Sequence, residues 1–311
     1  MQSLLSKRID LAAAIAATPP PIDMVLDGLP LGSLGVVLGS GGVGKSMMML
    51  HVAHAVAIGT DTLGCLLPEN RVTEHGRVVY LAGEDDELIF HHRVHAFARD
   101  LNADARAAMG ERMHVVPLVG SAPSLIDAQG DINDEAMTQI RECAKGTRLL
   151  IIDPLRQFHG ADENDNGAMT ILSKALAKIA HEEKCAIVLV HHTSKAGAKD
   201  DDADASMSRG ASAITDNARW VMALKKLSEK AIEDHGLLPP AWRYVTTRKV
   251  KSNYAALGDV TILERGDGGI LSSVAARSRD IVRETIAQIT PKRLPQTAAD
   301  LLEMMGDDDA A

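Results

Sequence analysis

The sequence contains few aromatic residues and few cysteines. Phe, Trp and Tyr make up only 3% of the 311 residues, so aliphatic side chains must fill the core. A core of Val, Ile and Leu is typical of a parallel sheet that is buried on both faces. Cys65, Cys143 and Cys185 are scattered and odd in number, which argues against a disulfide framework. We expect buried thiols in a reducing compartment.

Long apolar runs and an excess of positive charge are also lacking. No apolar run reaches the roughly 18 residues that a membrane-spanning helix needs, so we expect no membrane partner. Asp10 interrupts the short apolar stretch at the start of the chain, which argues against a secretory signal and favours a cytoplasmic protein. The net charge is −9, whereas nucleic-acid-binding domains are usually basic. Contact with DNA would therefore need a local basic patch.

Strand and helix patterns alternate along much of the chain. Right-handed βαβ units predict an α/β fold with a mostly parallel central sheet and helices on both faces. The closely spaced late strands predict an antiparallel carboxy-terminal extension, with a hairpin turn at "GDGG". The predicted strands are 35–38, 77–83, 113–119, 148–154, 186–192, 219–227, 242–252 and 259–274. The predicted helices are 45–58, 87–101, 134–144 and 170–184.

One core domain is expected at residues 35–277. An amino-terminal arm and lead-in would occupy 1–34, with a short helix over 1–17 that the prolines at 19–21 end. A helical, partly flexible tail would occupy 278–311. The polar stretches 159–167 and 195–208 follow apolar strands, at the edge where open α/β sheets bind ligands. They are predicted to be mobile loops, with simple solvated connectors as the alternative.

The stretch "GSGGVGKS" matches the phosphate-loop pattern G-x-x-x-x-G-K-[ST] in full. A strand before it and an apolar helix after it supply the required context. The glycines let main-chain N–H groups surround phosphates, and the helix amino terminus adds partial positive charge. The lysine is expected to reach the β- and γ-phosphates, and the serine to hold Mg²⁺. The predicted ATP-binding residues are Gly39, Ser40, Gly41, Gly42, Val43, Gly44, Lys45 and Ser46.

Two carboxylates end predicted strands. Asp153 closes "RLLIID", which is the position of the acid that orders Mg²⁺ through water in phosphate-loop enzymes. Nothing acidic directly follows Asp153, so Glu84, in "VVYLAGEDD", is assigned the role of general base toward water. Asp85 and Asp86 are predicted to form the first turn of the next helix, where negative charge is favourable.

The histidines of the chain raise two questions: whether one of them senses the γ-phosphate, and whether any of them bind a metal ion. His191 and His192 end the strand "IVLVHH", where a polar side chain could sense the γ-phosphate. His51 and His54 lie in the apolar helix after the phosphate loop and are predicted to be core residues. "HHRVH" lacks the glutamate of H-E-x-x-H, and "DENDNG" has Ser173 where a calcium loop needs Glu. We therefore expect no metal site at either stretch.

The order of these motifs resembles that of the RecA-like ATPases, specifically the small hexameric replicative helicases of broad-host-range plasmids, the RepA type. The resemblance spans roughly residues 10–272. It rests on the phosphate loop with "YLAGEDD", "LLIIDPL", "IVLVHHTSK", "SRGASAITDNARW" and "KVKSNY". It implies a RecA-like fold and a homohexameric ring that binds ATP between subunits and moves along single-stranded DNA in plasmid or phage-type replication.

The resemblance also assigns roles to residues. Lys45 and Ser46 would bind phosphate and Mg²⁺, Glu84 would activate water, and Asp153 would be the Walker B acid. His192 matches the sensor of the γ-phosphate, and Arg219 matches the arginine that enters the neighbouring subunit's site. Arg209 and Arg248 remain alternatives for that arginine. Arg248 and Lys251 lie in the basic stretch "TRKVKS" and could contact nucleotide or DNA.

Several points stay open at the level of sequence. The stretch 195–208 should grip DNA in such a ring, yet its aspartates oppose phosphate binding, so it could contact another molecule. No primase region is recognisable, so replication initiator or primase proteins are expected as partners. A regulatory or recombination ATPase without unwinding activity, a small-molecule kinase and a non-catalytic nucleotide-binding scaffold are the alternative functions.

Overall fold

A computed structural model describes residues 4–59, 72, 74–163, 165–193 and 212–275 of the chain. Its main feature is a twisted nine-stranded sheet. The parallel strands are β3 (Leu34–Gly39), β4 (Val78–Ala82), β5 (Met113–Pro117), β6 (Leu149–Asp153), β7 (Ala186–His192) and β8 (Trp220–Lys226). The antiparallel extension is β9 (Tyr244–Ser252), β10 (Thr261–Arg265) and β11 (Leu271–Ser273).

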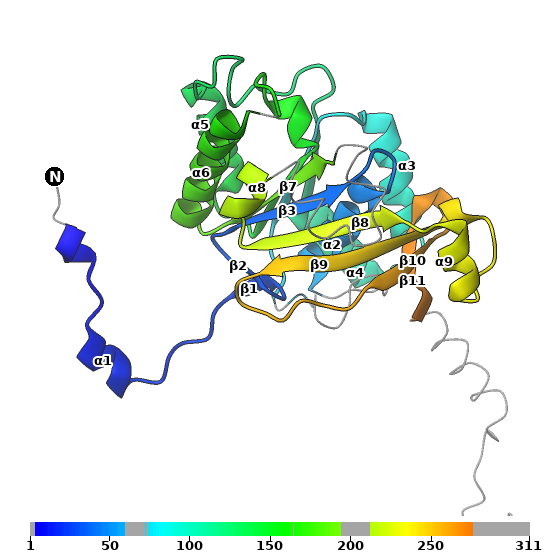
Figure 1. Cartoon of the computed structure of the whole chain (residues 1–311), viewed down its shortest axis with the longest axis horizontal. Coiled ribbons are helices and arrows are strands. Elements are labelled where there is room, and N and C mark those ends of the chain that lie inside the picture. Colours follow the sequence, from blue (N-terminus) through cyan, green and yellow to red (C-terminus); the bar gives the residue numbers. More distant parts are fainter. Residues whose placement is uncertain (1–3, 60–71, 73, 164, 194–211, 276–311) are drawn as a thin grey trace, which may run out of the picture.

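The strand order is β11-β10-β9-β8-β3-β7-β6-β4-β5, which places β3 near the middle of the sheet (Figure 1). Every pair from β8 to β5 is parallel, and every pair from β8 to β11 is antiparallel. The predicted fold class, a mostly parallel sheet with an antiparallel carboxy-terminal extension, is therefore confirmed. The carboxyl ends of β3, β4, β6 and β7 meet at one edge of the sheet, because these strands run parallel in register.

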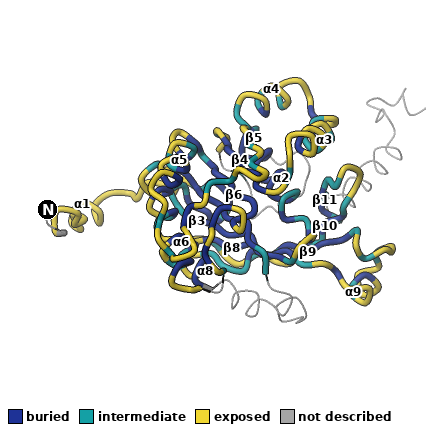
Figure 2. Tube along the Cα trace, turned by 90° about the horizontal axis from the view of Figure 1, so that it is seen from above, coloured by how far each residue is buried: buried dark blue, intermediate teal, exposed yellow. Residues whose placement is uncertain are grey.

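Helices cover both faces of the sheet. On one face lie α2 (Lys45–Ile58), α3 (Glu87–Ala98) and α4 (Ala103–Arg112). The other carries α5 (Asp134–Ala144), α6 (Asn166–Glu183), α8 (Ser212–Asn217) and the 3-10 turn η3 (Leu155–Phe158). The central strands are buried on both faces, which explains their unbroken apolar sequence (Figure 2). No described helix is both long and apolar enough to cross a bilayer.

Several boundaries differ from the sequence predictions for local reasons. Helix α6 begins before residue 170 because the Asp165 carboxylate caps it, accepting from the N–H groups of Gly167 and Ala168. The sequence does not predict helix α4, since Met109 is its only residue among the described ones that is buried, and its polar surface gives no helical periodicity. The stretch 1–17 is not a single helix. It contains η1 (Leu4–Lys7) and α1 (Leu11–Ala16), and Asp10 caps the second.

The amino-terminal arm stands away from the body, and α1 has no buried residue within the described part of the chain (Figure 1). The loop predicted at 195–208, Arg209, Cys65 and the tail at 278–311 lie outside the described residues. A last short helix, α9 (Glu229–Asp234), and the turn η5 (Ala241–Arg243) lie in the connection between β8 and β9.

A small hairpin joins the arm to the sheet. It consists of β1 (Met24–Leu26) and β2 (Leu29–Pro30), and Gly28 turns it with φ of 81°. Asp27 Oδ2 lies 2.5 Å from Lys249 Nζ on β9. The Lys249 side chain is 0% exposed, whereas Asp27 is 40% exposed. A lysine buried this completely needs its counter-ion, so this ion pair ties the hairpin to the extension of the sheet.

Removing Asp27 should therefore destabilise the fold. We expect Asp27→Ala to lower the free energy of unfolding by about 2 kcal/mol, because it leaves a buried ammonium without its anion. Lys249→Met should cost less, since it removes the buried charge itself. Glu182→Ala is the control, because the Arg141–Glu182 pair is exposed on both sides, and such pairs contribute about 0–1 kcal/mol. Urea unfolding measures all three, and equal effects of Asp27→Ala and Glu182→Ala would contradict the assignment.

Candidate functional site

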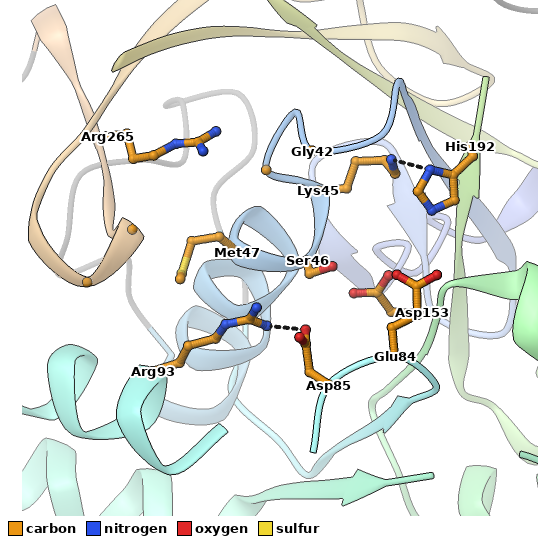
Figure 3. Close-up of a pocket in the computed structure, with 13 residues that line it drawn as sticks. Gly42, Lys45, Ser46, Met47, Glu84, Asp85, Arg93, Asp153, His192 and Arg265 are labelled. Atoms are coloured by element: carbon orange, nitrogen blue, oxygen red, sulfur yellow. Dashed lines mark hydrogen bonds and ion pairs between the residues drawn. The ribbon is translucent and has the colours of Figure 1, made fainter. Parts of the chain in front are cut away.

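A pocket of about 400 Å³ opens at the carboxyl edge of the parallel strands (Figure 3). Its wall combines the start of α2, the segments after β4, β6 and β7, and the β10–β11 hairpin. The lining residues are Gly42, Gly44, Lys45, Ser46, Met47, Glu84, Asp85, Arg93, Asp153, His192, Arg265, Gly268 and Gly269. Seven predicted site residues meet here: Gly42, Gly44, Lys45, Ser46, Glu84, Asp153 and His192.

The phosphate loop takes a backbone path that requires glycine at two points. Gly42 has φ of 68° and Gly44 has φ of 105°, both in the left-handed region that other residues rarely adopt. A Cβ at Gly41 or Gly42 would meet no described atom within 4 Å, so this side of the loop is open. A Cβ at Gly44 would instead lie 3.0 Å from Arg265 Nη2. The loop thus leaves room for a ligand on one side and is packed on the other.

Lys45 is the most constrained charge of the pocket. Its side-chain Nζ donates to the carbonyl oxygens of Gly39 at 2.8 Å and Ser40 at 3.0 Å, and lies 3.2 Å from His192 Nδ1. Burial lowers the pKa of the Lys45 ammonium to about 8, against the opposing effect of Asp153 and Glu84. Burial, with the nearby Lys45 charge, also lowers the pKa of His192. A neutral His192 can accept a hydrogen bond from the Lys45 ammonium at Nδ1, so the two side chains are hydrogen-bonded to each other.

Asp153 ends β6 and is 5% exposed. Its Oδ2 accepts a hydrogen bond from the hydroxyl of Tyr80 on β4. The Tyr80 hydroxyl also lies 3.3 Å from the carbonyl oxygen of Ser46. Burial raises the pKa of Asp153, while hydrogen bonds from Tyr80 and Ser46 oppose this. Burial, with the Asp153 charge, raises the pKa of Tyr80, so the phenol keeps the proton that it donates.

Glu84 lies beside Asp153 and is exposed to the pocket (Figure 3). Gln157 Nε2, on η3, lies 3.4 Å from Glu84 Oε1. Gly83 lets the chain leave β4 tightly, because a Cβ there would come 2.6 Å from the Gln157 Cβ. A carboxylate that is solvated and directed into the pocket is suited to accept a proton from water.

The residues present fit a magnesium–nucleotide complex. Ser46 and Asp153 are oxygen donors at one end of the pocket, and Mg²⁺ prefers oxygen ligands while keeping several waters and phosphate oxygens. Within the described ranges, no group of three or more His, Cys, Asp or Glu side chains could hold a metal ion. A cation at Ser46 and Asp153 would therefore take its remaining ligands from phosphate and water.

Outside the phosphate loop, three predicted residues do not line this pocket. Arg219 precedes β8 at the opposite edge of the sheet, where its N–H donates to the carbonyl oxygen of Leu34. Lys251 Nζ donates to the carbonyl oxygens of Thr215 at 2.7 Å and Asp216 at 3.1 Å, at the end of α8. Arg248 on β9 pairs with Ala223 on β8. All three are therefore candidates for contacts outside the pocket of their own chain.

The far end of the pocket has no counterpart in the sequence predictions. Arg265 ends β10 and its Nη2 donates to the carbonyl oxygen of Val43 at 3.1 Å. The turn η6 (Asp267–Gly269) follows, and a Cβ at Gly269 would lie 3.2 Å from the Met47 Cε. The sequence indicates a turn at "GDGG", and Met47 directly follows the phosphate loop. The η6 turn and Met47 come together only because β8, β9, β10 and β11 pair in sequence.

The predictions for the neighbouring residues Asp85 and Asp86 have different outcomes. Asp86 caps α3, as its Oδ1 accepts from the Ile89 N–H at 2.9 Å. Asp85, however, is not in the first helical turn. It forms an ion pair of 2.6 Å with Arg93 in the pocket wall.

His51 and His54 of α2 are buried, as the sequence predicts. His51 Nε2 accepts a hydrogen bond from the Leu271 N–H at 2.9 Å.

Solved structures with a similar fold include an ATPase domain, a helicase and a KaiC-like protein. The ATPase domain matches with a TM-score of 0.55 and 14% identity, covering 85% of this chain and 96% of that one. A DnaB-like replicative helicase, studied with primase, matches with a TM-score of 0.55 and 14% identity, covering 88% and 67%. A KaiC-like protein from Pyrococcus horikoshii OT3 matches with a TM-score of 0.53 and 13% identity, covering 81% and 99%. At these identities the matches establish a shared fold.

A protein-family profile described as an AAA domain matches residues 3–198. This range holds the phosphate loop, Glu84, Asp153 and His192, and it covers more than half of the chain. The chain therefore belongs to the family described as an AAA domain.

Proposed function

We propose that this protein is an ATP hydrolase that works as a homohexameric DNA helicase and moves along single-stranded DNA in plasmid or phage-type replication. One observation carries the enzymatic part: Lys45, Ser46, Glu84, Asp153 and His192 converge on one pocket around the phosphate loop. The motif order of the RepA type supports the motor part, as does the fold shared with a solved ATPase domain and a DnaB-like replicative helicase.

In this proposal the pocket divides the work of hydrolysis. The loop N–H groups and Lys45 hold the phosphates, and Ser46 with Asp153 holds Mg²⁺, which neutralises charge on the β- and γ-phosphates. Glu84 accepts a proton from the attacking water at its carboxylate, and Gln157 holds that carboxylate in place. His192 exchanges its contact with Lys45 for one with the γ-phosphate, and so reports hydrolysis to the chain that follows β7.

The nucleoside would lie at the other end of the pocket, against Met47, Arg265 and the glycines of η6. The catalytic carboxylates occupy the γ-phosphate end, so the base and ribose must extend away from them. The Arg265 guanidinium is fixed by Val43 and is close enough to the loop to cover a base by stacking.

A second subunit would complete the site. Arg219 is exposed at the edge of the sheet that is remote from its own pocket. Lys251 lies nearby. Burial and the Arg219 charge lower the pKa of Lys251, while the Asp216 charge opposes this shift. Placed in a neighbour's pocket, Arg219 would stabilise the charge of the transition state. Six copies of one basic patch around a channel would also reconcile DNA binding with a net charge of −9. A replication initiator or a primase is the expected protein partner.

Steady-state ATP hydrolysis with and without single-stranded DNA tests the function. We expect DNA to stimulate turnover at protein concentrations that permit ring assembly. Glu84→Gln should lower turnover about 10²–10⁴-fold while nucleotide binding persists. A clear basal rate that DNA does not change would favour a regulatory ATPase, and unchanged turnover in Glu84→Gln would refute the general-base assignment.

The nucleoside end can be tested separately from the phosphate end. We expect Arg265→Ala to weaken ATP binding about tenfold through loss of guanidinium stacking, with unchanged binding of inorganic tripolyphosphate. Lys45→Ala is the matched control, because it should weaken both ligands. Isothermal titration calorimetry measures both affinities. Parallel losses of ATP and tripolyphosphate in Arg265→Ala would instead place Arg265 among the phosphate contacts.

Mixing of variants tests the shared site. Arg219→Ala alone should lower hydrolysis about a thousandfold. Mixing Arg219→Ala with Glu84→Gln should restore part of the activity, because some interfaces then combine an intact Glu84 with an intact Arg219. Mixing Glu84→Gln with Lys45→Ala should restore none, since both residues lie in one subunit's pocket. Equal behaviour of the two mixtures would argue against an arginine supplied by the neighbour.

A further inference from the structure

Tyr80 is a buried polar residue that the hydrolysis scheme does not use. It lies in the middle of β4 on the face that packs against α2, and its side chain is 0% exposed. Its ring packs edge-on against Phe90 of α3, with centroids 5.7 Å apart. In the sheet, Ala82 pairs with Asp153 and Tyr80 pairs with Ile151, so Tyr80 lies diagonally behind the aspartate.

The Tyr80 hydroxyl connects two parts of the candidate magnesium site. It donates to Asp153 Oδ2, and it lies 3.3 Å from the main-chain oxygen of Ser46 in the first turn of α2. A hydroxyl has one proton, and the carboxylate is the stronger acceptor because the bond is charge-assisted. The hydroxyl thereby fixes the Asp153 carboxylate at the end of β6, beside the start of α2.

This hydrogen bond also orients the carboxylate. Asp153 is 5% exposed, so solvent has little part in choosing its rotamer. Tyr80 engages Oδ2, and the Ser46 side chain also hydrogen-bonds the carboxylate, so protein partners set the direction in which Asp153 meets a cation or its water. A ligand held by such an outer partner is preorganised, and loss of the partner typically weakens metal affinity 10–100-fold.

We propose that Tyr80 is a positioning residue for the magnesium site, acting through Asp153. The inference rests on the proposed function, in which Ser46 and Asp153 hold Mg²⁺ with the nucleotide. It assigns to the middle of β4 a role that ordinary core packing does not require, since phenylalanine would fill the same volume.

The test is Tyr80→Phe, which keeps the ring against Phe90 and removes only the hydroxyl. A fluorescent ATP analogue is titrated first in EDTA and then at increasing Mg²⁺. We expect binding in EDTA to stay as in the unmodified protein, while the half-saturating Mg²⁺ concentration rises at least tenfold. Tyr244→Phe is the matched control, because Tyr244 is a buried tyrosine on β9 that does not line the pocket.

The double variant shows whether Tyr80 acts through Asp153. Asp153→Asn should raise the Mg²⁺ requirement, and adding Tyr80→Phe to it should produce no further shift, since coupled residues are not additive. An unchanged Mg²⁺ requirement in folded Tyr80→Phe, an equal loss of binding in EDTA, or a full additional shift in the double variant would each overturn the assignment. Absence of Mg²⁺-dependent binding in the unmodified protein would instead refute the proposed function itself.

Discussion

Burial of the Lys45 ammonium is the constraint on which the site depends. The side chain is 4% exposed and is held by the carbonyl oxygens of Gly39 and Ser40 and by His192. Removing a charge from water is costly, and the lowered pKa expresses that cost. The nearby hydrogen-bond acceptors and the carboxylates at the ends of β4 and β6 offset the cost of burying this charge. An anion bound at the loop would lower this cost further, so the pocket is suited to phosphate.

Much of this site could be predicted from the sequence because it lies at strand ends. Asp153, Glu84 and His192 each follow an apolar run, and parallel strands bring their carboxyl ends to one edge. Helix α2 has the bounds that the sequence predicts, since the loop glycines fix its start and Gly59 adopts a left-handed φ of 87° at its end. Local chemistry decides these elements, so no knowledge of distant contacts is needed.

The parts that could not be predicted depend on long-range pairing or on position within a strand. Arg265 and η6 reach the pocket only because β9, β10 and β11 extend the sheet antiparallel from β8, which lies beside β3, and nothing local to "ERGDGG" specifies that arrangement. Tyr80 lies in the middle of an apolar run, where a tyrosine usually indicates packing alone. Arg219 is proposed for the site from family resemblance alone, and it lies at the opposite edge of the sheet, outside the pocket of its own chain.

The hydrogen bond between Leu271 and His51 has a consequence for how nucleotide is exchanged. It fastens the β10–β11 hairpin to the interior of α2, while Arg265 fastens the same hairpin to the phosphate loop. Both hydrogen bonds would have to break before the hairpin could move away from α2 and the phosphate loop. In the function proposed above, a nucleotide would therefore leave through the open side of the pocket while the hairpin and the phosphate loop keep their contact.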